Sequence, residues 1–277
     1  MQIRIVAPSG PVTEERLDGG IALLEEAGFR VTSSPAVRAR DGYLAGDDAM
    51  RTRDFIDALN DAPDVIWAAR GGYGAGRIAH EIAKHCDGPL PVLVGFSDTT
   101  VLHCLWQQHG AFSIHAANVS TVAEWDHAAR TQLFSMIRGE CRSAVLPAMG
   151  GEGHAQGPLF VANLTVLASL VGTSVFPDLA GHILVVEDIN EAPYRLDRVM
   201  SQLHHAGALR DLAGLAIGQC TGDAKYEESV AAIRRGLNDA RVAVCFGLPV
   251  GHDASSVALP QGVMATMDPT QLTWVRA

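Results

Sequence analysis

Short apolar runs alternate with longer amphipathic stretches from residue 3 to about residue 115, and this alternation constrains the fold more than any other feature. Short apolar runs are typical of buried strands, whereas apolar residues at three- and four-residue spacing are typical of helices. The predicted strands are Ile3–Ala7, Phe29–Thr32, Asp64–Ala69 and Pro91–Val94, and the predicted helices are Thr13–Ala27, Asp47–Asn60, Ala75–Lys84 and Thr99–His109. This order predicts an N-terminal α/β lobe built on a doubly wound parallel sheet.

A second lobe of different character follows a weakly patterned, glycine-rich segment around residues 121–157. A polar helix is expected at Asp126–Ile137, and the proline and glycines after it indicate a linker. Beyond it we predict helices at Leu164–Val171, Tyr194–Ala206 and Glu227–Asn238, and strands at Ile183–Val186, Leu215–Gly218, Ala243–Phe246, Val257–Leu259, Val263–Met267 and Leu272–Val275. We therefore expect an N-terminal α/β domain over residues 1–125, a linker region over 126–156 and a second, smaller mixed α/β domain over 157–277.

Composition argues against several classes of protein. The 31 acidic residues outnumber the 21 basic ones, the formal net charge is −10 and no long Lys/Arg run occurs, so nucleic-acid binding is not the expected role. Residue 1 leads directly into a strand, without the features of a signal peptide, and no apolar stretch reaches the roughly 18 residues that span a bilayer. We expect a soluble cytoplasmic protein with no membrane partner.

The chain also lacks the usual signatures of a disulfide framework or a metal centre. Its 5 cysteines are odd in number and form no C-x-x-C pair, so most are expected to be small core residues. No H-E-x-x-H or comparable ligand spacing occurs, and His204 and His205 are adjacent on a predicted helix, where neighbours face different directions. We expect no catalytic metal and no cofactor.

A glycine-rich segment, Arg70-Gly71-Gly72-Tyr73-Gly74-Ala75-Gly76, follows a predicted buried strand and opens a helix. Glycines there let backbone N–H groups approach a ligand, as an anion or oxyanion cradle requires. The alternative is a tight turn with no ligand, which is common in α/β folds. The spacing matches neither of the two common nucleotide-binding glycine patterns.

Ser97 lies in Gly95-Phe96-Ser97-Asp98-Thr99-Thr100, between a predicted strand and a predicted helix. A serine on such a turn resembles the nucleophile elbow of hydrolases. The match is incomplete, because Thr99 stands where the second glycine of G-x-S-x-G would be. The same residues would also form an ordinary helix N-cap.

Three carboxylates and one histidine are candidates for an acid that orients a base and for the base itself. Glu187, Asp188 and Glu191 follow an apolar run, where an acid could orient a histidine or cap the next helix, and the pattern does not choose among the three. His252 lies in a loop beside Gly251 and Pro249. It could act as a general base, or it could simply be a solvated side chain.

Together these segments provide the groups needed for covalent acyl transfer: a serine, an acid, a histidine and a backbone cradle. They occur in the order serine, acid, histidine, as in α/β-hydrolases. The acid and histidine fall in the second lobe, which predicts a site between the lobes.

Several longer motifs carry a family resemblance. They are Ala-Pro-Ser-Gly at 7–10, Tyr-Leu-Ala-Gly at 43–46, Arg-Gly-Gly-Tyr-Gly at 70–74, Gly-Phe-Ser-Asp at 95–98, Ala-Asn-Leu at 162–164, the stretch 183–198 and Gly-His at 251–252. In this order, nearly end to end, they resemble the serine LD-carboxypeptidases. The stretches 186–195 and 202–207 are most similar to the bacterial muramoyltetrapeptide carboxypeptidases.

The resemblance implies a Ser97–Glu187–His252 triad and an oxyanion hole formed by the backbone N–H groups of Gly72 and Asp98. It implies cleavage of the amide between the L-centre of a diamino acid and a terminal D-alanine in cytoplasmic murein tetrapeptides, for peptidoglycan recycling, by a homodimer. Many members have glycine at the position of Ala162 and a His-Gly-Pro-like run where this chain has His115-Ala116-Ala117-Asn118.

Such an enzyme must also bind a free carboxylate. Arg70, Tyr73 and Arg195 are the candidate substrate-binding residues, with Arg198 as a further cation. One alternative is a peptidase of the same fold that hydrolyses peptidyl-nucleotides such as processed microcin C, for which Trp106 or Trp125 could offer an aromatic platform. The other is a module that binds wall peptides without cleaving them.

Overall fold

The computed structural model describes residues 1–238 and 242–276, which divide into two compact units. Unit 1 comprises Met1–Thr131 with Ser174–Pro177, and unit 2 comprises Gln132–Thr173 with Asp178–Ala277. Each unit is built on its own sheet.

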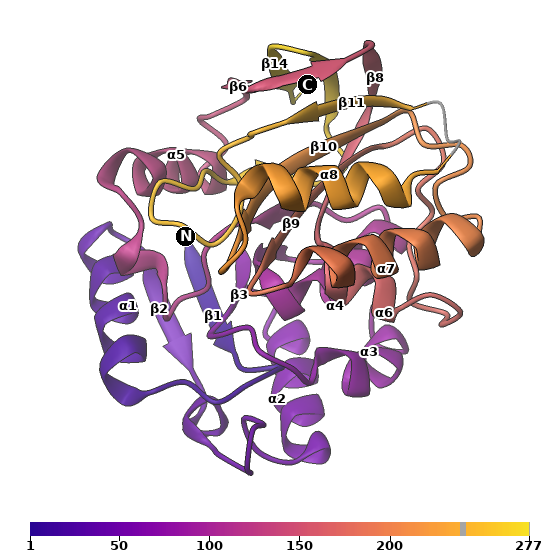
Figure 1. Cartoon of the computed structure of the whole chain (residues 1–277). Helices are drawn as coiled ribbons and strands as arrows, with labels where there is room; N and C mark the ends of the chain where they lie inside the picture. Colours follow the sequence, from indigo (N-terminus) through magenta and orange to yellow (C-terminus); the bar gives the residue numbers. More distant parts are fainter. Residues whose placement is uncertain (239–241, 277) are drawn as a thin grey trace. The chain divides into compact units, whose positions relative to one another are not determined.

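Unit 1 is a doubly wound α/β fold, as predicted. Its strands are all parallel and lie in the order β2-β1-β3-β4-β5. Their bounds are β1 (Gln2–Val6), β2 (Arg30–Ser33), β3 (Val65–Ala68), β4 (Val92–Gly95) and β5 (Ser113–His115), and the connecting helices are α1 (Glu14–Glu26), α2 (Asp48–Asn60), α3 (Ala75–Ala83) and α4 (Thr100–Gln108). In Figure 1, α1 lies on one side of β1 and β2, and α2 lies on the other.

The strand order creates a switch point between β1 and β3. From β1 the chain passes to β2 on one side, and from β3 it passes to β4 on the other. Ligands of open α/β sheets bind at the carboxyl ends of strands beside such a point. The loops that leave β1, β3 and β4 all start at this edge.

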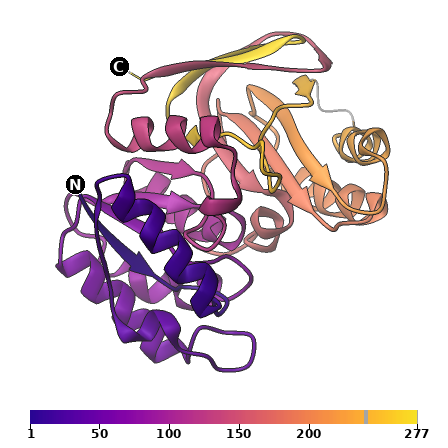
Figure 2. The ribbon, with the colours of Figure 1, turned by 90° about the vertical axis from the view of Figure 1, so that its left-hand side faces the viewer.

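Unit 2 is a mixed sheet, which confirms the expected mixed α/β lobe. The strand order is β6-β14-β13-β8-β9-β10-β11-β7, in which β8 to β11 are parallel and the flanking strands are antiparallel. The strands are β6 (Ser143–Pro147), β7 (Gly150–Glu152), β8 (Ala155–Asn163), β9 (Ile183–Ile189), β10 (Gly214–Thr221), β11 (Ala243–Phe246), β13 (Met264–Asp268) and β14 (Gln271–Val275). Figure 2 shows β6 running beside β14.

Helices α6 (Leu164–Ser169), α7 (Pro193–His205) and α8 (Tyr226–Gly236) complete unit 2. The last two pack closely side by side, as Figure 1 shows. A Cβ on Gly236 would lie 2.4 Å from the Cβ of Met200, so only glycine permits this approach.

The segment predicted as a linker is largely ordered structure. It contains α5 (His127–Ile137), β6, β7 and the start of β8. The two short strands are mostly exposed or half-buried and contain glycine and proline, so their sequence shows little alternation. Because these residues extend its sheet, unit 2 is not the smaller of the two. The domain boundaries at residues 125 and 157 stay a prediction.

Two short elements also differ from expectation. β5 was not predicted, because three residues are too few to show a pattern. The strand expected at Val257–Leu259 is instead the two-residue β12 (Leu259–Pro260).

The expectation of core cysteines is confirmed, since Cys86, Cys104, Cys220 and Cys245 are buried. Among the described residues, no helix is long and apolar enough to cross a membrane.

Candidate active site

Ser97 occupies a sharp turn between β4 and α4. Its φ of 60° lies in the left-handed region, which costs a residue with a side chain about 1–2 kcal/mol. Phe96 is the N-cap of the short 3-10 helix that Ser97 begins, Thr99 is the N-cap of α4, and neither helix start has a side-chain cap. Ser97 therefore does not act as a helix cap, and its half-buried side chain remains accessible.

The glycine-rich loop after β3 packs directly against this serine. A Cβ on Gly71 would lie 2.9 Å from both the Cβ and the Oγ of Ser97, so the approach requires glycine. Gly72 follows with a φ of 101°. Its N–H donates no hydrogen bond to the described part of the chain. A backbone donor thus lies two residues from Arg70, in the loop that contacts the candidate nucleophile.

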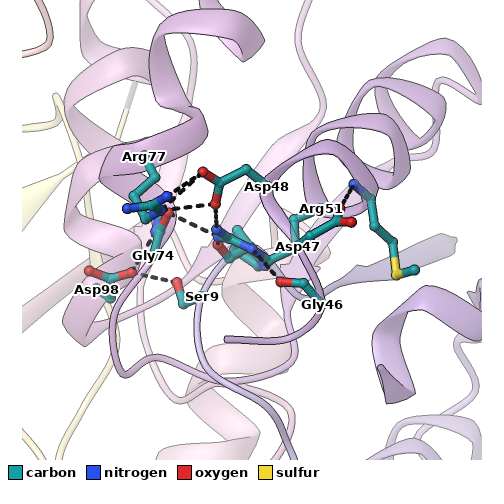
Figure 3. A network of polar contacts seen from close by, with 11 residues as sticks. Ser9, Gly46, Asp47, Asp48, Arg51, Gly74, Arg77 and Asp98 are labelled. Carbon is teal, nitrogen blue, oxygen red and sulfur yellow. Dashed lines mark hydrogen bonds and ion pairs between the residues drawn. The ribbon is translucent and has the colours of Figure 1, made fainter. Parts of the chain in front are cut away.

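The side chain of Asp98 joins three loops at the edge of the unit 1 sheet. Its Oδ2 accepts a hydrogen bond from Ser9 Oγ at 2.6 Å and another from the Ala75 N–H at 2.9 Å (Figure 3). The side chain is buried, and burial raises the pKa of its carboxyl group against the opposing effect of these hydrogen bonds. The turn that carries Ser97 is thereby connected to the loop after β1 and to the start of α3.

A buried arginine extends the same network. Arg51 donates to the carbonyl oxygens of Pro8, of Gly46 at 3.3 Å and of Gly74 at 2.9 Å (Figure 3). Asp48 accepts from Arg51 and also pairs with Arg77 at 2.7 Å. These residues were not predicted from the sequence. The sequence did contain one indication that Arg51 is buried: it lies four residues before the apolar Phe55 and therefore on the same face of α2.

In unit 2, Glu187 and His252 form a direct pair. His252 Nδ1 donates to Glu187 Oε2 at 2.7 Å. Glu187 is fully buried at the end of β9, whereas 14% of the His252 side chain is exposed. Burial alone lowers the pKa of His252, but the hydrogen bond and charge of Glu187 outweigh it, so the pKa of the imidazole is raised. Burial also raises the pKa of Glu187, and the hydrogen bond from His252 opposes that rise.

The other two candidate acids have different partners. Asp188 accepts from Asn163 Nδ2 at 3.1 Å and from the N–H and hydroxyl of Thr165 at 2.9 and 2.7 Å, so it supports the start of α6. It points away from Glu187 because successive strand residues face opposite sides of a sheet. Glu191 pairs with Arg195 at 3.5 Å on the surface.

Gln219 holds the loop that carries His252. Its Oε1 accepts from the Asp253 N–H at 3.1 Å and from Ser256 Oγ at 2.8 Å. A Cβ on Gly251 would lie 2.7 Å from the Gln219 side chain. Gln219 itself lies where the register of β10 shifts between Ile217 and Cys220. No sequence motif indicated this role, because the contacts depend on strand pairing.

The expected substrate-binding residues are all on the surface. Arg70 donates to the Pro11 carbonyl at 2.7 Å, and the exposed ring of Tyr73 lies 6.0 Å from that of Tyr43. In unit 2, Arg195 is engaged by Glu191 and by the hydroxyl of Tyr194 at 3.2 Å. Arg198 lies over the same tyrosine ring at 5.4 Å.

Several aromatic side chains belong to the core. Trp106 is completely buried and donates to the Pro91 carbonyl at 2.9 Å, and Trp125 is 4% exposed. Neither offers an open ring face as a platform for a base. His115 is buried beside Phe96.

Within residues 1–238 and 242–276, no group of three or more His, Cys, Asp or Glu side chains could hold a metal ion.

Residues 3–116 match the model of the LD-carboxypeptidase N-terminal domain, and residues 156–267 match that of the LD-carboxypeptidase C-terminal domain. The chain belongs to the LD-carboxypeptidase family. The family resemblance predicted from the motifs is therefore confirmed, and with it membership in a family of hydrolases.

Individual relatives of this LD-carboxypeptidase cover nearly its whole length. The probable murein peptide carboxypeptidase of Bacillus subtilis is 32% identical over 99% of the chain and 90% of its own length. The murein tetrapeptide carboxypeptidase of Pseudomonas aeruginosa is 30% identical over 99% of this chain and 95% of its own length. The crystal structure of muramoyltetrapeptide carboxypeptidase from Oxalobacter formigenes matches with a TM-score of 0.84 at 29% identity, covering 99% of both chains.

More distant structures share the fold alone. An MccF-like protein from Bacillus anthracis matches with a TM-score of 0.87 at 20% identity, covering 100% of this chain and 97% of its own. The microcin C7 self-immunity protein of Escherichia coli is 20% identical over 95% of this chain and 88% of its own. The two-lobed architecture is thus common to both groups.

Proposed function

We propose that this protein is a serine LD-carboxypeptidase that releases the terminal D-alanine from murein tetrapeptides in peptidoglycan recycling. The scissile bond is the amide between the L-centre of the diamino acid and D-alanine. The observation that carries the proposal is the 2.7 Å hydrogen bond between His252 and the buried Glu187, in a chain whose full-length relatives are named murein peptide carboxypeptidases. We further propose that it acts in the cytoplasm as a homodimer.

In the proposed reaction, His252 Nε2 accepts the Ser97 Oγ proton while Oγ attacks the carbonyl carbon before D-alanine. Glu187 accepts the Nδ1–H bond, which fixes the imidazole tautomer and stabilises the imidazolium. The N–H groups of Gly72 and Asp98 bind the oxyanion of the tetrahedral intermediate. His252 then protonates the leaving amine of D-alanine.

Water completes the cycle. His252 removes a proton from a water molecule while the water oxygen attacks the ester carbonyl of the acyl-enzyme. The ester bond to Ser97 Oγ then breaks, and His252 returns the proton to Oγ, which restores the hydroxyl. No cofactor enters the proposed steps. The left-handed backbone at Ser97 and the close approach of Gly71 support this assignment, because strained residues and glycine contacts are typical of such nucleophile turns.

The test is mass spectrometry of a murein tetrapeptide that ends in D-alanine, incubated with the wild type, with Ser97→Ala and with Ser33→Ala. Ser33 is an exposed serine at the end of β2 and serves as the matched control. We expect D-alanine release by the wild type and by Ser33→Ala, but not by Ser97→Ala. Equal release by all three proteins would contradict the assignment of the nucleophile.

A peptidyl-adenylate tested in parallel separates the rival functions. Cleavage of the nucleotide conjugate alone would place the protein with the immunity peptidases. Tight tetrapeptide binding without turnover would make it a binding module. Both results would contradict the proposed carboxypeptidase.

A further inference from the structure

A small cavity of about 220 Å³ opens at the switch point of the unit 1 sheet. One wall is the segment Pro11–Thr13, which follows β1, and another is Arg70, which follows β3. Open α/β sheets bind ligands at this position, outside the carboxyl ends of the strands where the chain turns to opposite sides. The cavity therefore has the location of a ligand site.

The cavity is strongly basic. Arg16, Arg40 and Arg70 line it, and none of the lining residues among those described is a carboxylate. Arg16 pairs with Glu124 at 2.9 Å, and Arg70 donates to the Pro11 carbonyl. Arg40 makes no ion pair or hydrogen bond with the described residues. Each guanidinium has five N–H donors, so donors remain on all three arginines.

A hydroxyl group on the cavity wall adds an independent indication of a ligand. Ser120 lines the cavity and is 5% exposed, with its backbone N–H bonded to the Ala69 carbonyl at 3.0 Å. Its hydroxyl has no hydrogen-bond partner among the described residues. The hydroxyl can therefore donate a hydrogen bond to an oxyanion in the cavity.

The cavity adjoins the candidate nucleophile through glycines. A Cβ on Gly10 would lie 3.3 Å from Arg70 Nη1 and 3.0 Å from the Gly71 carbonyl oxygen. Gly71 in turn contacts Ser97. A group bound in the cavity can therefore belong to the molecule whose carbonyl is attacked by Ser97.

We propose that this arginine pocket, formed by Arg16, Arg40, Arg70 and Ser120, binds a carboxylate of the peptide substrate. The inference rests on the proposed function and identifies Arg40 and Ser120 as its specificity-determining residues. Guanidinium groups bind carboxylates with directed, charge-assisted hydrogen bonds. The carboxylate is either the terminal one or another along the peptide, and the two are distinguished by amidating each in turn.

The experiment measures tetrapeptide binding by calorimetry in the Ser97→Ala protein, which cannot turn it over. We expect Arg40→Gln to weaken the Kd about tenfold, as for loss of one charge-assisted contact, and Arg53→Gln to leave it unchanged. Arg53 is an exposed arginine on α2 outside the pocket. Amidation of the recognised carboxylate should weaken binding similarly and abolish the effect of Arg40→Gln. A Kd within twofold of the parent for Arg40→Gln would overturn the proposal.

A failure of the tetrapeptide to bind at all would count against the proposed function rather than against the pocket. Titration with inorganic phosphate tests the pocket independently of that function. We expect phosphate to shift the amide NMR signals of Thr13 and Ser120 in the wild type, and to shift them much less in Arg40→Gln. Unchanged signals in the wild type would overturn the assignment of an oxyanion pocket, whatever the substrate.

Discussion

His252 Nδ1 and Glu187 Oε2 lie 2.7 Å apart, although 65 positions separate the two residues in the sequence. Glu187 is inaccessible to solvent at the end of β9, and the histidine covers it from a glycine-flanked loop. A carboxylate in a low-dielectric interior binds an imidazole N–H strongly. The pair is thus suited to hold one tautomer and to stabilise the protonated ring.

The pH dependence of activity should reflect this pair. Burial lowers the pKa of His252 and Glu187 more than compensates, so the pKa is raised and the acidic limb of kcat/KM should lie above about pH 6.5. Glu187→Gln removes the carboxylate but not the burial. We expect the limb to move to lower pH and kcat to fall by about 10⁴. Rates measured across about pH 5–9 test this, and an unshifted limb would contradict it.

The backbone at Ser97 predicts a trade of stability for activity. Ser97→Gly should relieve about 1–2 kcal/mol of left-handed strain and lose about 0.5–1 kcal/mol to backbone entropy. Ser97→Ala keeps its Cβ and therefore its strain. We expect both variants to be inactive, with Ser97→Gly the more stable by up to about 1.5 kcal/mol in urea unfolding. At Ser33, in a strand, the order should reverse, and the same order at both positions would count against strain.

Gln219 should act on the reaction by positioning His252. Gln219→Met removes the oxygen that accepts from Asp253 and Ser256 while keeping the side-chain length. We expect kcat to fall at least about tenfold with little change in KM, because the base moves rather than the binding groups. Gln219→Glu keeps an acceptor and should recover much of kcat, with the acidic limb at higher pH. Equal losses in both variants would indicate a structural role alone.

The Asp98 network should couple stability to Ser9. Asp98→Ala leaves a buried hydroxyl and the Ala75 N–H without an acceptor, at a cost of about 1–3 kcal/mol. Ser9→Ala should cost about 1 kcal/mol. In the double variant the losses should fall short of their sum by at least about 0.5 kcal/mol, as measured by denaturant unfolding. Strict additivity would show that the contact contributes nothing.

Local patterns predicted much of this protein correctly. The alternation of apolar runs predicted the parallel sheet of unit 1, and strand-to-helix turns drew attention to Ser97 and Gly72. Short edge strands such as β6 and β7 were missed because they bury few side chains and so show no period. Their stability comes from pairing with distant strands, which no local window contains.

The family, the doubly wound lobe and the set of candidate groups could be predicted from the residues alone, because these depend on residue types at short range. Residue patterns left three acids open as partners of His252, and the family resemblance implied Glu187. In the fold, alternation along β9 turns Glu187 toward His252 and Asp188 toward α6. The roles of Arg51, Gln219 and the arginine pocket also required the fold. Each depends on loops far apart in the chain meeting at the carboxyl ends of strands, and the sheet alone sets that proximity.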